Sequence, residues 1–92
     1  MGTAIITLKI MPESPEEDLK RIENEAMQFI VAASDERQKK VEVIPVAFGL
    51  ESINITFLCD EKKADMEPLQ EKISGIAGVQ SVEVSDMRRI IG

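Results

Sequence analysis

Hydrophobic and polar residues alternate over residues 3–10, in the sequence TAIITLKI. One face of this segment carries only apolar side chains, those of Ala4, Ile6, Leu8 and Ile10. A period of two is typical of a half-buried β-strand. Alternation and strand-forming composition predict further strands at 41–48 (VEVIPVAF), 53–59 (INITFLC) and 79–86 (VQSVEVSD).

Between the first two strands, apolar residues recur at spacings of three and four, which predicts a helix with one buried stripe. The stripe consists of Leu19, Ile22, Ala26, Phe29, Ile30 and Ala33. We predict that this helix begins at SPEEDL, with Ser14 as N-cap, Pro15 at the first helical position and Glu17 completing a capping box. The acidic residues there would suit the helix dipole. The polar stretch after Ala33 predicts its end.

A second, shorter helix is predicted after the charged loop DEKKAD. Its stripe consists of Leu69, Ile73 and Ile76. Asp65 is predicted as the N-cap, Pro68 is tolerated in the first turn, and Gly78 is predicted to stop the helix.

The predicted order is β-α-β-β-α-β. Pro45 lacks an N–H, so the second strand is expected at a sheet edge or bulged. The residues FGLES that follow predict a hairpin. Strands with one polar face indicate a sheet covered on one side only. We therefore predict one ferredoxin-like α+β domain over residues 1–92, a four-stranded antiparallel sheet with two helices on one face.

Composition narrows the possible partners. The chain has 17 acidic and 11 basic residues, a net charge of −6, and neither Trp nor Tyr, so direct nucleic-acid binding is disfavoured. A protein with a basic patch is the better partner. No apolar run is long enough to span a membrane, and a single cysteine fits a cytoplasmic protein.

The residue types argue against catalysis. Without histidine, and with Cys59 as the lone thiol, a transition-metal site is not expected, and neither is a cofactor. Cys59 ends an apolar strand face and is followed by two acidic residues, which predicts a small buried side chain rather than a nucleophile. We therefore expect the protein not to be an enzyme.

Two features remain as candidates for function. Phe48 comes directly before Gly49 in the predicted hairpin; the residues alone favour a core position, and the alternative is an aromatic anchor for another protein. Arg88 and Arg89 lie in the tail DMRRIIG. They are either solvated charges on a frayed strand end or a cationic tip for carboxylates or phosphates of a partner.

Three stretches resemble the archaeal elongation factor 1-beta family: TLKIMPESPEEDL, PVAFGL and VQSVEVSDMRRIIG. The resemblance covers essentially the whole chain and implies a ferredoxin-like guanine-nucleotide exchange factor for the elongation factor 1-alpha GTPase. It also implies that Phe48 packs against the GTPase, and that Arg89, with Arg88 beside it, reaches the GTPase's magnesium and phosphate region. The eukaryotic pattern has lysine at the tail position and lysines where this chain has Glu51 and Ser52.

Other functions share the predicted strand order. A small-molecule-sensing ACT-like regulatory module has the same order and a similar last strand. A ribosome-associated or RNA-binding ferredoxin-like protein is opposed by the acidity and the missing aromatic residues. Faster release of GDP from the cognate GTPase would distinguish the exchange factor from the ACT-like module.

Overall fold

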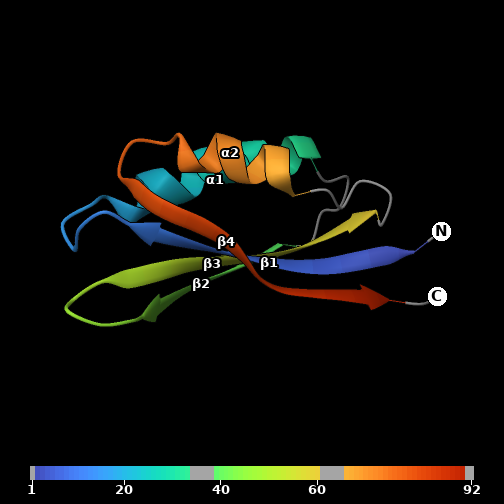
Figure 1. Cartoon of the computed structure of the whole chain (residues 1–92), viewed down its shortest axis with the longest axis horizontal. Coiled ribbons are helices and arrows are strands. Elements are labelled where there is room, and N and C mark those ends of the chain that lie inside the picture. The colour runs from blue at the N-terminus through green and yellow to red at the C-terminus, as the bar shows by residue number, and fades with distance from the viewer. Residues whose placement is uncertain (1, 34–38, 61–65, 91–92) are drawn as a thin grey trace.

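Six elements follow one another in the predicted order, in a computed structural model that describes residues 2–33, 39–60 and 66–90. They are β1 (Thr3–Pro12), α1 (Leu19–Ala33), β2 (Lys39–Pro45), β3 (Glu51–Asp60), α2 (Glu67–Ser74) and β4 (Val79–Ile90). The strands pair antiparallel in the order β2-β3-β1-β4. Both helices cover the same face of the sheet, and the other face is open (Figure 1). The predicted ferredoxin-like fold is confirmed.

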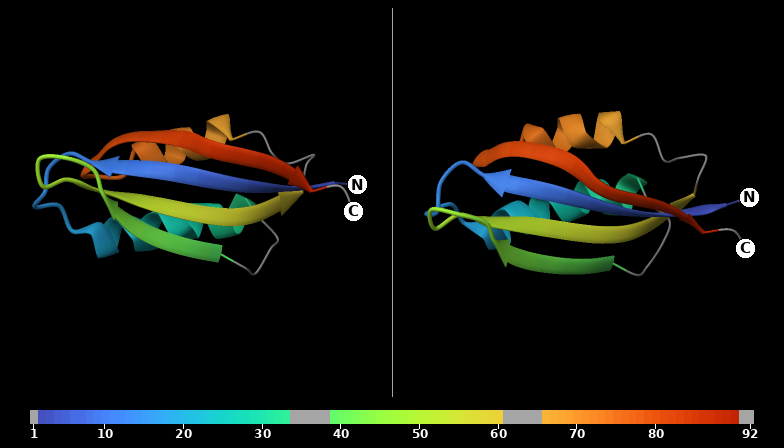
Figure 2. Two further views of the ribbon diagram at one scale, coloured as in Figure 1. Left: turned by 90° about the horizontal axis from the view of Figure 1, so that it is seen from below. Right: turned by 60° about the horizontal axis from the view of Figure 1, so that its bottom comes forward.

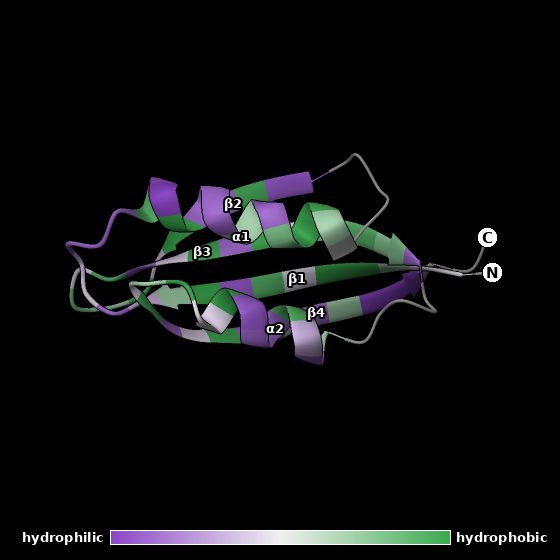
Figure 3. Cartoon of the chain, turned by 90° about the horizontal axis from the view of Figure 1, so that it is seen from above, coloured by the Kyte–Doolittle hydropathy of each residue, from purple (hydrophilic) through white to green (hydrophobic). Residues whose placement is uncertain are grey.

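The core forms between the two central strands and the helices. The predicted apolar face of β1 is buried, and its register places Leu8 beside Ile55 of β3. The buried face of β3 consists of Ile53, Ile55, Phe57 and Cys59. Seen from above, hydrophilic and hydrophobic residues follow one another along both helices (Figure 3), and the buried hydrophobic ones, such as Ile22 and Ile73, belong to the core. Alternation in the strands and the three-four spacing in the helices therefore predicted most of the core, with Leu19 and Phe29 only partly buried; the side chain of Ala33 lies outside the described residues.

The start of α1 differs from the prediction. The helix begins at Leu19, and Asp18 caps it: the backbone N–H of Arg21 donates to Asp18 Oδ1 at 3.2 Å. Ser14 instead closes a separate turn, in which its carbonyl oxygen accepts from the N–H of Glu17 at 3.3 Å. A helix beginning at Pro15 would gain a turn without an apolar side chain to bury, and packing is what stabilises short helices. The acidic residues thus precede the helix.

The boundaries of α2 also differ. Met66 occupies the N-cap position without a side-chain cap, and the predicted cap Asp65 lies outside the described residues. Pro68 lies in the first turn, as predicted. The helix stops at Ser74 with Gly75 as C-cap, because glycine is a poor helix residue. Gly78, the predicted stop, has a φ of 93° and instead turns the chain into β4.

These two glycines have opposite expected responses to alanine. Gly78→Ala would force a side chain into the left-handed region and place its methyl carbon 2.6 Å from Glu17 Oε1. We expect it to lower the free energy of unfolding by about 1–2 kcal/mol in urea titration. Gly75→Ala is the matched control, since Gly75 has a φ of −80° and ordinary space, and it should leave stability unchanged or raise it. Equal losses in both variants would contradict this assignment.

No helix in these three described ranges is long and apolar enough to cross a membrane.

Candidate partner-binding surface

The hairpin between β2 and β3 ends in a tight turn at residues 47–50. The backbone N–H of Leu50 donates to the carbonyl oxygen of Ala47 at 2.9 Å, and the N–H of Val46 donates to Leu50 at 2.9 Å. The two central residues, Phe48 and Gly49, both have positive φ, 55° and 79°. Positive φ at both central positions defines a type I′ turn. This turn is favoured in hairpins because its twist matches that of the flanking strands.

Phe48 is exposed at the tip of this turn. Its fractional exposure is 96%, so the interpretation of Phe48 as a core residue is wrong. The phase of β2 could not place it, since the strand ends at Pro45 and the turn redirects the chain. A bulky side chain at positive φ costs about 1–2 kcal/mol, and here no burial offsets that cost. An exposed aromatic residue at positive φ makes this turn a candidate for contact with a partner.

Other apolar side chains extend this feature along β2. Six large hydrophobic residues are exposed among the described ones, and four of them lie between residues 43 and 48: Val43, Ile44, Val46 and Phe48. Val43 and Ile44 project on opposite faces of the sheet, because they are consecutive in a strand. We call these four residues the apolar strip. Ile44 and Val46 were not predicted as site residues, although apolar residues flanking Pro45 on an edge strand were a signal.

Glu51 and Ser52, which stand where the eukaryotic pattern has lysines, have different environments. Ser52 is buried, accepts a hydrogen bond from Asn54 Nδ2 at 2.8 Å and donates to the carbonyl oxygen of Ile44 at 3.4 Å. Glu51 is exposed at the start of β3. Ser52 therefore stabilises the hairpin. Of these two residues, only Glu51 has a side chain that is accessible to a partner.

Arg88 and Arg89 belong to a paired strand. β4 continues past the predicted end and pairs with β1 as far as Ile90, so these arginines are not in a frayed segment. Arg88 pairs with Ile5 and lies on the open face, where its Nε lies 3.1 Å from Asp86 Oδ2. Arg89 pairs with Ala4, whose side chain faces the helices. The two cations thus leave β4 on opposite sides.

An irregularity in β4 decides these directions. The register with β1 shifts between Thr7 and Leu8, which pair with Asp86 and Val84, so Ser85 is an extra residue. Such a bulge reverses which residues face the core. Val84 faces the helices before it, and Met87 and Arg89 do so after it. Ser85 Oγ donates to the carbonyl oxygen of Thr7 at 3.3 Å.

The hairpin tip and the arginines lie at opposite ends of an elongated molecule. Its extents are 42 × 21 × 20 Å. The turn between β2 and β3 lies at one end of the long axis, and β4 ends at the other beside the start of β1 (Figure 1). The two predicted contact features are therefore not brought together, and a partner must extend along the molecule to meet both.

Two further predictions concern metal ligands and Cys59. Nowhere in 2–33, 39–60 and 66–90 do three or more His, Cys, Asp or Glu side chains gather as a metal site would require. Cys59 is buried, as predicted, and its Sγ donates to the carbonyl oxygen of Asp60 at 3.3 Å. The fold is that of a ferredoxin-like domain, and the exposed hairpin tip and the two arginines are its candidate contact features.

Comparison with known proteins identifies the family. Residues 5–90 match the family model described as the EF-1 guanine nucleotide exchange domain, and the chain belongs to this family of non-enzymatic exchange factors. It is 35% identical over 91 residues to elongation factor 1-beta of Methanothermobacter thermautotrophicus, covering 99% of this chain and 100% of the relative. It is 40% identical over 91 residues to elongation factor 1-beta of Methanobrevibacter smithii, with the same coverage.

Solved structures support the fold alone. The de novo designed protein Foldit4 matches with a TM-score of 0.67 and 15% identity over 98% of each chain. LarC2, the C-terminal domain of a cyclometallase involved in the synthesis of the NPN cofactor of lactate racemase, matches with a TM-score of 0.62 and 11% identity over 99% of this chain and 58% of that one. The match to the exchange-domain family, rather than these structures, confirms the resemblance seen in the sequence and favours the exchange factor over the ACT-like module.

Proposed function

We propose that this protein promotes GDP release from the elongation factor 1-alpha GTPase by contacting it at both ends of the long axis. Family membership gives the exchange function in translation elongation. The observation that carries the mode of binding is Phe48, a phenylalanine at positive φ with 96% of its surface exposed. The exposed ring adds no stability to the free protein, whereas a pocket on a partner would bury it.

The hairpin end supplies the anchor. Aromatic side chains in desolvated pockets commonly dominate interface energetics, and surrounding apolar contacts exclude water from them. Phe48 would be that anchor, and the neighbouring Val46 and Ile44 of the apolar strip would surround it. Burying these side chains against the GTPase fixes the factor's orientation along the partner.

The other end supplies positive charge. Mg²⁺ neutralises the phosphate charge of a bound nucleotide in GTPases, so a cation that competes for the metal or phosphate ligands weakens nucleotide binding. Arg89 is the residue that the family resemblance assigns to this role. A guanidinium forms forked hydrogen bonds and is suited to phosphate or carboxylate oxygens. Arg88 leaves the strand on the open face beside Asp86, so its approach to a partner differs.

Exchange of this kind is a thermodynamic linkage. If the factor weakens GDP binding by a given ratio, GDP weakens factor binding by the same ratio. Each tenfold weakening requires about 1.4 kcal/mol of coupling. No covalent step is needed, and binding energy from the two ends supplies the coupling.

Release of a fluorescent GDP analogue from the purified cognate GTPase tests the proposal. We expect the rate to rise with factor concentration and to saturate, and we expect excess GDP to weaken factor binding reciprocally. The matched control is a GTPase of another family, whose release rate should not change. Unchanged release from the cognate GTPase at saturating factor would refute the proposal.

A further inference from the structure

We propose that Pro15, in the loop between β1 and α1, is a positioning residue that supports the hairpin tip and sets the direction of Phe48. This inference rests on the proposed role of Phe48 as the anchor. Both views in Figure 2 place the loop after β1 beside the β2–β3 hairpin at one end of the molecule. The sequence MPESP therefore contributes to the partner-binding end, although it lies far from the hairpin in the chain.

Pro15 lies beside Gly49. A methyl carbon added to Gly49 would lie 3.6 Å from Cγ and 3.7 Å from Cβ of Pro15, which is ordinary van der Waals distance. The pyrrolidine ring thus lies next to the residue that follows Phe48, separated from it by the space of about one methyl group. Because Pro15 is exposed, it adds no burial to the main core. Its place beside the hairpin tip is therefore its structural role, together with the turn that it occupies.

The loop that carries Pro15 is itself fixed. The carbonyl oxygen of Ser14 accepts from the N–H of Glu17 at 3.3 Å, closing a turn with Pro15 at its second position, where proline's restricted φ is favourable. Just before this turn, the N–H of Glu13 donates to the carbonyl oxygen of Gly78 at 2.8 Å. The loop is therefore held to the turn between α2 and β4 while Pro15 faces the hairpin.

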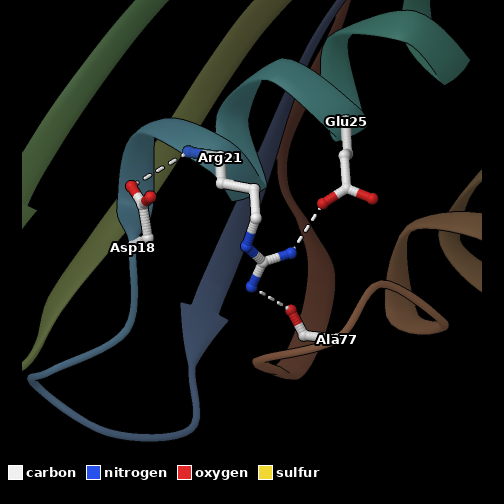
Figure 4. A network of polar contacts seen from close by, with 4 residues as sticks. All are labelled: Asp18, Arg21, Glu25 and Ala77. Atoms are coloured by element: carbon white, nitrogen blue, oxygen red, sulfur yellow. Dashed lines mark hydrogen bonds and ion pairs between the residues drawn. The ribbon is translucent and has the colours of Figure 1, made fainter.

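Arg21 strengthens the same attachment (Figure 4). Its Nη2 donates to the carbonyl oxygen of Ala77 at 2.7 Å, and its Nη1 lies 2.6 Å from Glu25 Oε2. Its backbone N–H donates to Asp18, the residue that ends the loop. One side chain thereby joins the start of α1 to the turn before β4. The support under Pro15 is anchored to the body of the protein through side-chain and backbone hydrogen bonds.

The hairpin needs such support because its own bonds do not fix its direction. The two hydrogen bonds of the turn hold its shape, but β2 is an edge strand with β3 as its single partner. Phenylalanine is also a poor residue for the first central position of a type I′ turn, where asparagine and glycine are preferred. A tip that moves must be ordered on binding, which weakens affinity. Pro15 beside the tip limits its movement toward the loop and so preorganises it.

The experiment uses the absence of Trp and Tyr in the chain. Phe48→Trp introduces a single indole at the tip, whose time-resolved anisotropy reports local mobility. In this background we compare Pro15→Ala and Pro15→Gly with Pro68→Ala, an exposed proline in the first turn of α2. We expect both Pro15 variants to increase the fast local motion of the indole, and Pro68→Ala to leave it unchanged. Circular dichroism verifies that each variant is folded.

The same substitutions in the Phe48 protein are then tested for exchange. We expect the half-saturating factor concentration to rise roughly three- to tenfold in the Pro15 variants, with the maximal rate retained. Unchanged indole motion would overturn the inference whatever the exchange activity of the wild-type protein, and so would an unchanged half-saturating concentration if the wild-type protein is active. If the wild-type protein leaves GDP release unaltered, the proposed function fails instead, and the anisotropy alone decides whether Pro15 holds the hairpin.

Discussion

Replacing Phe48 by asparagine should make the free protein more stable and remove most of its exchange activity. Asparagine tolerates positive φ better than phenylalanine and is a preferred residue at this position of a type I′ turn. With the side chain 96% exposed, little burial is lost, so the free energy of unfolding should rise by roughly 0.5–1 kcal/mol. Loss of an aromatic anchor typically costs about 2 kcal/mol or more in binding, about 30-fold.

Opposite changes in stability and activity are the diagnostic result. Urea unfolding measures the first, and the half-saturating concentration for GDP release measures the second. Val31→Asn is the control, because Val31 is an exposed apolar residue on α1, outside the apolar strip. It should leave exchange unchanged. A Phe48→Asn protein that exchanges at wild-type concentrations would show that the ring is not an anchor, and one that is destabilised would show that the turn is not strained.

Arg89→Ala should lower the maximal rate of GDP release by about 10- to 100-fold. Hydrogen bonds to charged groups contribute about 1.5–3 kcal/mol, and this contact is expected to act on the nucleotide site rather than on docking. The maximal rate, not the half-saturating concentration, should therefore change. Arg88→Ala should have a smaller effect, since Arg88 lies on the other face of β4 beside Asp86. Arg89→Lys, which restores the eukaryotic residue type, should retain much of the rate.

Lys20→Ala controls for net charge. Lys20 is an exposed cation on α1 whose Nζ lies 3.5 Å from Glu23 Oε2. The Lys20→Ala variant changes the net charge by the same amount as Arg89→Ala without altering the C-terminal end. GDP release in its presence should therefore be as fast as with the wild-type protein. Full exchange by a protein carrying both Arg88→Ala and Arg89→Ala would exclude the mechanism through the tail while leaving the family assignment intact.

Much of the fold was predictable because its determinants are local in sequence. Alternation in β1 and β3 and the stripes of α1 and α2 identified the buried residues, and Pro45 correctly placed β2 at an edge. The start of α1 was not predictable from capping residues alone, since Ser14 and Asp18 are both suitable N-caps. Which of them caps the helix depends on where apolar burial begins, and that is a property of the packed structure.

The candidate site was predictable in part. The family resemblance indicated Phe48, Arg88 and Arg89 from the sequence alone, whereas strand phase could not show that Phe48 occupies a turn at positive φ. The position of Pro15 beside Gly49 could not be foreseen, because the two residues lie in loops separated by an entire helix and strand. The same holds for the side of β4 on which each arginine emerges, which depends on strand pairing.

The extra residue Ser85 has a consequence for how relatives should be aligned at this end. Because the bulge reverses the phase of β4, the face of a tail residue depends on its distance from Ser85 and not from the chain terminus. A relative that has the same number of residues here but pairs without a bulge would present the cation preceding Arg89 to the helix side, whereas one that lacks Ser85 altogether would keep Arg89 opposite Ala4. Tail arginines and lysines across the family are therefore equivalent when they pair with the same residue of β1, whatever their distance from the chain terminus, and an alignment gap opposite Ser85 leaves that pairing unchanged.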